Sequence, residues 1–253
     1  MNEKKSQIKV IIFGATGNLG KRLVAKGIEL GYLITAFVRN RNKIEKQFNG
    51  KLPVNLTIIE GDIFQPESVG NAINGHGFLI NAAGNAADGN KFFELCQIVL
   101  TQAVKQLEEP KRVWFLAGLA ALEFGSSGIM GVDCPGMPKI YMNHKKNYEA
   151  LLKTDIDWSL MCPGPLIESP HSKLTNNMRL SIDEMPFEYP KWLTKFPKIV
   201  LSLVMKRHLS ETIVSYEDIA NIIMTNLGAR GIYSQKRVGV ALPKGMKGMK
   251  ENY

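Results

Sequence analysis

Residues 9–20 read KVIIFGATGNLG, and the fold of the whole chain depends on this stretch. The apolar run that ends at Phe13 is typical of a strand buried on both faces of a parallel sheet. Three glycines follow at once: Gly14, Gly17 and Gly20. From Asn18 the apolar residues recur at helical spacing, so we expect a helix that Asn18 caps and that ends near Gly31. The stretch therefore predicts a strand, a tight glycine turn and a helix.

Each glycine suits one task in a loop that holds a dinucleotide. Gly14 lets the chain turn sharply, Gly17 lets the backbone approach a pyrophosphate, and Gly20 lets the helix pack against the strand. The first turn of the helix adds unpaired N–H groups and a partial positive charge. The predicted pyrophosphate loop consists of Gly14, Ala15, Thr16, Gly17, Asn18 and Leu19. The alternative is a purely structural turn.

The end of the second predicted strand, Leu33–Val38, selects between the two nicotinamide dinucleotides. One βαβ unit brings this strand end beside the adenosine ribose. An acidic residue there accepts a hydrogen bond from the ribose 2′-OH and favours NAD, but this chain has Arg39, followed by further basic residues. A guanidinium suits a 2′-phosphate. We therefore expect NADP(H) as the cofactor, with NAD less favoured.

Length and composition exclude several classes of protein. The chain has 253 residues, enough for one α/β domain with an extension. No segment reaches the ~18 consecutive apolar residues of a membrane span, and residues 1–7 have no signal-peptide core, so we expect a cytoplasmic protein without a membrane span. The three cysteines are far apart, which indicates neither a disulfide framework nor a metal site.

A net charge of +9 raises the question of nucleic-acid binding. The basic residues gather in the loop after Val38, in residues 191–207 and in residues 236–250, without a recognition-helix or RNA-binding signature. An anionic cofactor accounts for the first group, and a solvated surface accounts for most of the rest. We therefore expect no nucleic-acid partner.

Strands and helices alternate six times up to Leu166. The sequence thus predicts an α/β fold, a doubly wound parallel sheet of the NAD(P)-binding Rossmann type. We expect residues 1–166 to form the Rossmann core and residues 167–211, where prolines break the rhythm, to form a substrate-side lid or insert. Residues 212–253 then add a helix, with Ser215 as its possible N-cap, and a last strand that complete the same domain.

Further cofactor-binding residues follow the later strands. Asp62 and Ile63 come after the third strand, where Asp62 either accepts from the adenine amino group or caps the next turn. The small residues after the fourth strand let the backbone lie against the ribose and nicotinamide, or form a plain turn. They are Ala82, Ala83 and Gly84. Pro163 follows the sixth strand and completes the predicted set.

Tyr141 and Lys145 are one helical turn apart, in the region that flanks the nicotinamide. A tyrosine hydroxyl with a pKa near ~10 transfers protons poorly at neutral pH. A lysine cation nearby lowers that pKa, and the same lysine can hold the cofactor ribose. We therefore predict Tyr141 and Lys145 as catalytic residues, with Lys145 also binding cofactor. The alternative is a tyrosine at a helix start beside a solvated lysine.

Together these motifs resemble the short-chain dehydrogenase/reductase superfamily, in its atypical branch of NmrA-like NAD(P)H-binding proteins. The matching residues are 14–20, Arg39, 61–62, 81–84, Tyr141 to Lys145 with Glu149, and 157–164. Two departures stand out. The family often has Arg where Cys162 stands, and residues 117–119 read Ala-Gly-Leu where catalytic members carry a serine.

Two functions follow from this resemblance. The first is an NADP(H)-dependent oxidoreductase that reduces a small carbonyl or quinone-like substrate. The second is a non-catalytic redox sensor or regulatory protein of the NmrA-like type, which the missing serine favours. The resemblance also implies a possible homodimer through the helix over residues 91–107 and the helix after Pro138.

A third possibility is a peripheral membrane protein. Large apolar residues alternate with lysines between residues 191 and 207: Trp192, Phe196, Ile199 and Leu203. Such a pattern occurs in helices that lie on membrane surfaces, and more often in lid or core helices. The sequence leaves these alternatives open.

Overall fold

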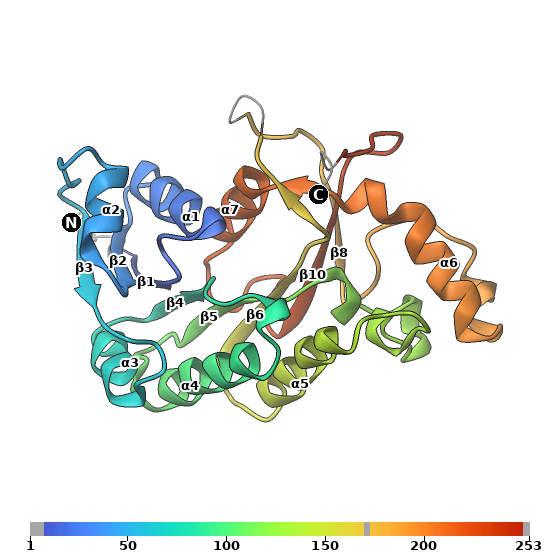
Figure 1. The fold of residues 1–253 in the computed structure, drawn as a ribbon, viewed down its shortest axis with the longest axis horizontal. Coiled ribbons are helices and arrows are strands. Elements are labelled where there is room, and N and C mark those ends of the chain that lie inside the picture. Colours follow the sequence, from blue (N-terminus) through green and yellow to red (C-terminus); the bar gives the residue numbers. More distant parts are fainter. Residues whose placement is uncertain (1–7, 170–172, 250–253) are drawn as a thin grey trace, which may run out of the picture.

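The computed structural model describes residues 8–169 and 173–249 (Figure 1). Its central sheet has the strand order β3-β2-β1-β4-β5-β6-β10-β8. The strands are β1 (Lys9–Phe13), β2 (Leu33–Val38), β3 (Leu56–Glu60), β4 (Phe78–Asn81), β5 (Arg112–Leu116), β6 (Asp157–Cys162), β10 (Lys236–Ala241) and β8 (Arg179–Ile182). All neighbours are parallel except β8, which pairs antiparallel with β10. The predicted doubly wound Rossmann sheet is confirmed.

Helices cover both faces of the sheet. They are α1 (Asn18–Glu29), α2 (Arg41–Gln47), α3 (Pro66–Ile73), α4 (Asn90–Gln106), α5 (Met142–Leu151), α6 (Lys198–His208) and α7 (Tyr216–Thr225). Figure 1 shows α1, α2 and α7 on one face and α3, α4 and α5 on the other, with α6 at the far end. Within the described ranges, none of the helices is both long enough and apolar enough to cross a bilayer.

Strand β1 shows why the sheet forms. Its residues alternate between two apolar cores, with Val10 and Ile12 facing α1 and α7, and Ile11 and Phe13 facing α3 and α4. All four side chains are fully buried. A strand covered on both faces must be apolar throughout, and this is the pattern of the sequence.

The region around the glycine turn differs from the prediction at two points. The N-cap of α1 is Gly17 and not Asn18, which is the first helical residue and makes no side-chain cap bond. Residues 41–47, which the sequence placed in a basic loop, form α2. The Asn40 side chain caps this helix by accepting from the N–H of Asn42 at 2.9 Å, and Arg41 pairs with Glu45 one turn later.

The segment 167–211 contains more regular structure than the sequence indicated. Strand β8 belongs to the central sheet as its antiparallel edge, and α6 packs at the end of the molecule. Two short strands, β7 (Leu166–Ile167) and β9 (Val214–Ser215), pair with each other. Residues 170–172 lie outside the described residues. Closure of the other residues over the site stays a prediction, as does the division into three parts.

The last helix follows the prediction. Ser215 caps α7, since its side chain accepts from the N–H of Asp218 at 3.0 Å. The helix packs beside α1, and the following strand β10 adds to the sheet next to β6.

Candidate functional site

The glycine turn connects β1 to α1 and packs against the residues that follow β4. Gly14 has a φ of +77°, and a Cβ there would lie 2.6 Å from the amide nitrogen of Ala83. A Cβ on Gly20 would collide with the carbonyl oxygen of Gly14 and lie 2.8 Å from the Cα of Ala15. The predicted tasks of Gly14 in the turn and Gly20 in helix packing are therefore confirmed.

The N-terminus of α1 is open to a ligand. Thr16, Gly17 and Asn18 are exposed, no side chain caps the helix, and its first turn has no acidic residue. The strand order reverses between β1 and β4, which is the point where open α/β sheets bind ligands. A cradle of backbone N–H groups at this point fits a pyrophosphate. The contact of Gly17 with a pyrophosphate stays a prediction.

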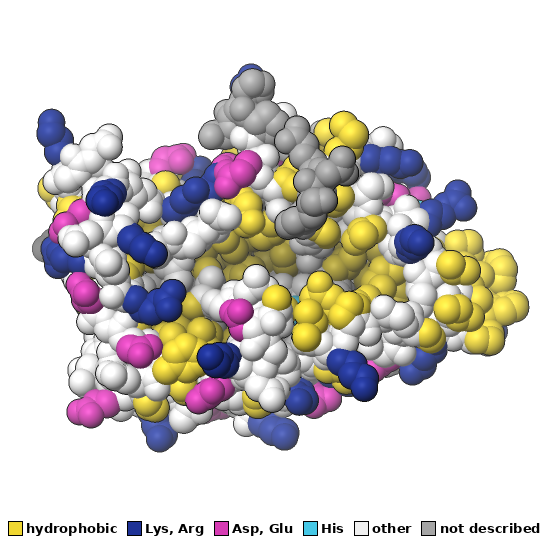
Figure 2. All heavy atoms as spheres, in the orientation of Figure 1, with side chains coloured by type: hydrophobic (Ala, Val, Ile, Leu, Met, Phe, Trp, Pro, Cys, Tyr) yellow, Lys and Arg dark blue, Asp and Glu magenta, His cyan; other side chains and the backbone are white. Residues whose placement is uncertain are grey.

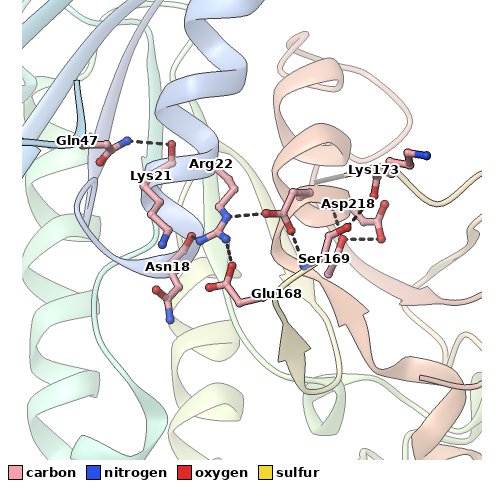
Figure 3. Close-up of polar contacts among 10 residues, drawn as sticks. Asn18, Lys21, Arg22, Gln47, Glu168, Ser169, Lys173 and Asp218 are labelled. Carbon is pink, nitrogen blue, oxygen red and sulfur yellow. Dashed lines mark hydrogen bonds and ion pairs between the residues drawn. The ribbon is translucent and has the colours of Figure 1, made fainter. Parts of the chain in front are cut away.

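Arg22 ties α1 to the segment after β7, as Figure 3 shows. Its guanidinium pairs with Glu168 and, at 2.8 Å, with Glu217 Oε1, and it donates to the carbonyl oxygen of Asn18 at 2.9 Å. Glu217 also accepts from the N–H of Ser169 at 3.2 Å. The sequence analysis did not single out Arg22, because only the tertiary structure brings two carboxylates to it.

Arg39 directly follows β2 and is exposed. The parallel register pairs Phe13 with Phe37, so Arg39, two residues further on, follows the same strand edge at which the glycine turn begins. Its neighbour Arg41 is engaged elsewhere, through Glu45 at 2.7 Å. Among the described residues Arg39 has no ion-pair partner, and its guanidinium is available to an anion at this edge.

Asp62 and Ile63 lie at the end of β3. The Asp62 carboxylate accepts from the N–H of Phe64 at 3.0 Å, so the capping role that the sequence left open is observed. Ile63 is buried in the core and can offer only its backbone to a ligand. Contact of either residue with adenine stays a prediction.

The ends of β4, β5 and β6 meet at the other half of the edge. The buried Asn81 side chain accepts from the N–H of Ala83 at 3.2 Å, and Gly84 turns the chain away with a φ of +91°. The carbonyl of Pro163 accepts from the N–H of Leu119 at 2.7 Å. The predicted residues Ala82, Ala83, Gly84 and Pro163 therefore lie at the same edge as the glycine turn. In Figure 2 the molecule is hollowed between its two helical layers, with hydrophobic side chains in the hollow.

Tyr141 and Lys145 lie at the start of α5. Tyr141 is half-buried, ends a short 3-10 turn (Lys139–Tyr141) and stacks on His144 with ring centroids 5.9 Å apart. Lys145 follows one helical turn later, with its Nζ 2.8 Å from Asp133 Oδ1. The proton-transfer role of Tyr141 and the ribose contact of Lys145 stay predictions.

Asp133 is a residue that sequence reasoning missed. Burial raises the pKa of its carboxyl, but hydrogen bonds from Lys145 and from the N–H of Met130 outweigh this effect, and the pKa lies below its ordinary value. The carboxylate is therefore ionised at neutral pH and holds the Lys145 ammonium. No signal in the sequence pairs these residues, because Asp133 lies in an irregular loop.

His144 is the second residue that was missed. It is 5% exposed, and its Nδ1 has no hydrogen-bond partner. A Cβ on Gly118 would lie 3.2 Å from His144 Nε2, so the imidazole takes the space beside Gly118, two residues after the end of β5. Burial lowers the pKa of His144 to about 4, and the ring is neutral at pH 7. The small residues 117–118, in place of the expected serine, were the available sequence signal.

Replacing His144 by Phe is expected to make the protein less sensitive to acid. The folded-state pKa near 4 lies below the ordinary 6.5, so between these values the unfolded chain binds more protons. The stability that depends on the neutral ring is complete above pH 6.5 and is lost as the pH falls toward 4. We expect the free energy of unfolding to fall by about 1 to 2 kcal/mol more in the wild type than in the variant. Urea unfolding across this pH range measures the difference, and identical pH profiles would contradict the prediction.

The chain is similar in sequence to known proteins over most of its length. Residues 14–183 match the family model described as NAD(P)H-binding. The uncharacterised protein YwnB of Bacillus subtilis is 26% identical over 186 residues, which cover 70% of this chain and 81% of YwnB. The protein TIC 62 of Pisum sativum, described as chloroplastic, is 28% identical over 211 residues, which cover 73% of this chain but only 38% of TIC 62.

The fold is shared with a solved short-chain dehydrogenase/reductase from Veillonella parvula in complex with NADP. The TM-score is 0.63 at 15% identity, over 94% of this chain and 95% of the other. Because the family model matches more than half of the chain, the protein belongs to the NAD(P)H-binding family. The predicted membership of an NAD(P)H-binding family is thereby confirmed.

Proposed function

We propose that the protein is an NADP(H)-dependent oxidoreductase that reduces a small carbonyl or quinone-like compound. The observation that carries this proposal is the group at the start of α5, where His144 lies beside Gly118 just after β5, Tyr141 stacks on His144, and Lys145 follows. His144 supplies a neutral, unpartnered imidazole next to Gly118, where catalytic relatives are expected to have a serine hydroxyl. The missing serine therefore does not leave the site without a polar group.

The residues that would hold the cofactor are those at the strand ends. In this proposal the loop from Gly14 to Leu19 binds the pyrophosphate and Arg39 binds the 2′-phosphate, which favours NADP(H) over NAD. Asp62 and Ile63 lie toward the adenine. Backbone groups of residues 82–84 and Pro163 lie toward the ribose and nicotinamide. The bound cofactor supplies the hydride.

Side chains at the start of α5 then deliver the proton and stabilise the charge that the reaction leaves. Hydride addition to a carbonyl leaves an alkoxide, and the Tyr141 hydroxyl delivers a proton to it. The Lys145 ammonium favours the phenolate that remains. The neutral His144 ring, fixed by its stack on Tyr141, orients that phenol. Asp133 holds Lys145 in place.

The alternative is a sensor that binds NADP(H) without turnover. The observation that favours it is the ion pair of Lys145 with Asp133, which partly neutralises the cation that Tyr141 needs.

Pairing of two copies through α4 and α5 also stays a prediction. These helices pack side by side and leave an open groove of about 510 Å³ on their outer face, which a second copy can fill.

Oxidation of NADPH against a panel of aldehydes, ketones and quinones tests the proposal, with NADPH binding measured alongside by calorimetry. We expect saturable turnover of at least one substrate class, and tighter binding of NADPH than of NADH. Tight NADPH binding without turnover across the whole panel would replace the enzyme proposal with the sensor. Failure to bind either dinucleotide would contradict both.

A further inference from the structure

A patch of exposed apolar side chains lies on α6 and the turn before it. Its members, called here the α6 patch, are Trp192, Phe196, Ile199 and Leu203, with exposed fractions of 58%, 50%, 52% and 62%. Ile199 and Leu203 are one turn apart on α6, and Trp192 and Phe196 belong to the 3-10 turn (Lys191–Lys195) and its end. Figures 1 and 2 place α6 at the end of the molecule, where hydrophobic side chains gather. The possibility of a core helix for these residues is therefore wrong.

Other side chains of α6 bind the helix to the body of the protein. Leu201 is fully buried in the main core, and the Ser202 hydroxyl donates to the carbonyl oxygen of Pro135 at 2.9 Å. The rings of Trp192 and Phe196 lie against each other, with centroids 5.5 Å apart. These contacts fix α6 on the body of the protein while its apolar side faces solvent.

Positive charge surrounds the α6 patch. Residues 191–210 contain no Asp or Glu. At the two ends of the segment Lys191 pairs with Glu184, and the His208 Nδ1 lies 2.6 Å from Glu211 Oε1. Four exposed cations between them have no ion-pair partner among the described residues: Lys195, Lys198, Lys206 and Arg207.

We propose that the α6 patch and these four cations form a docking surface for anionic phospholipid bilayers. The apolar side chains enter the headgroup region, and the cations meet the lipid phosphates. The surface is a projecting end of the molecule, which suits a flat bilayer better than a groove-binding peptide. A second copy is disfavoured as the occupant, because pairing two such patches would bring eight like charges together (four from each copy).

Docking would bring the candidate site near the bilayer. Helix α6 packs against the turn Gly131–Asp133, and Asp133 holds Lys145. The inference concerns the surface alone and does not depend on catalysis.

Vesicle binding of the full chain tests the proposal. The probes are phosphatidylcholine vesicles with and without phosphatidylglycerol, sedimented at low and high salt. We expect binding to the anionic vesicles, at least roughly tenfold weaker binding to neutral ones, and loss of binding at high salt. Equal binding to both kinds of vesicle, or no binding to either, would overturn the proposal.

Tryptophan fluorescence reports the contact directly. The chain has three tryptophans, and Trp114 and Trp158 are at most 2% exposed. An emission blue shift on adding anionic vesicles therefore comes from Trp192. Trp192→Phe should abolish the shift while the variant still sediments with vesicles. A blue shift that persists in this variant would overturn the proposed insertion.

Matched charge variants show whether vesicle binding depends on this docking surface or only on the net charge of the protein. Lys195→Glu with Lys206→Glu reverses two cations of the docking surface, whereas Lys51→Glu with Lys153→Glu makes the same change in net charge at exposed lysines elsewhere. We expect the first pair to weaken binding at least roughly tenfold and the second to leave it within about twofold. Phe196→Ser with Leu203→Ser should also weaken binding, compared with Ile232→Ser at an exposed position outside the patch. Equal losses in patch and control variants would overturn the proposal.

Discussion

Replacing Tyr141 by Phe is expected to slow the chemical step by ~10² or more, while the affinity for NADPH stays nearly unchanged. The variant keeps the ring and its stack on His144 but lacks the hydroxyl that delivers the proton. In the proposed mechanism Tyr141 is the proton donor, and Lys145 follows it one helical turn later. Single-turnover oxidation of NADPH with an active substrate measures the chemical step apart from product release.

Tyr148→Phe is the matched control for this experiment. Tyr148 lies on α5, and its ring packs under the Arg237 guanidinium at 4.3 Å and against Trp158, whereas the Tyr141 ring stacks on His144. We expect its activity to remain close to that of the wild type. Lys145→Ala should lower both the rate and the affinity, because the proposed mechanism assigns one ammonium to the phenol and the ribose. Full activity in Tyr141→Phe would move the proton transfer to another residue.

Replacing Arg39 by Ala is expected to remove most of the preference for NADPH over NADH. A charge-assisted contact between a guanidinium and a phosphate contributes roughly 1.5 to 3 kcal/mol, which corresponds to about one to two decades in affinity. NADH lacks the 2′-phosphate, so its affinity should change little. Calorimetric titration of the unmutated protein and of the Arg39→Ala variant with NADPH and with NADH gives the four dissociation constants that are needed.

Arg41→Ala is the control for Arg39. Arg41 has the same charge and lies two residues away, but it is paired with Glu45 within α2. Its loss should leave the cofactor preference nearly unchanged. Equal affinities of the unmutated protein for NADPH and NADH would show that Arg39 does not bind a 2′-phosphate.

Sequence reasoning could not place the site residues that lie in the loop after β5, because this loop has no helical or strand periodicity. Arg237 shows why. This buried residue on β10 pairs with Glu123 at 2.7 Å and Asp183 at 3.2 Å, and it donates to the carbonyl oxygen of Ala121 at 3.0 Å. These contacts fix the loop after β5, which leads on to Asp133. They join residues that are more than fifty positions apart, and no local pattern reports them.

By itself the sequence determined the Rossmann sheet, the glycine turn and the end of β2 at Arg39. These features depend on short-range rules, because an apolar run, a glycine with positive φ and a helical period are all local. The tertiary structure alone decided that β8 completes the sheet, that Asp133 holds Lys145, that His144 fills the space beside Gly118 and that the α6 patch faces solvent. Each of these depends on which distant residue packs against a given side chain. Periodicity cannot report such a contact, because the same apolar spacing serves a buried and an exposed helix face equally well.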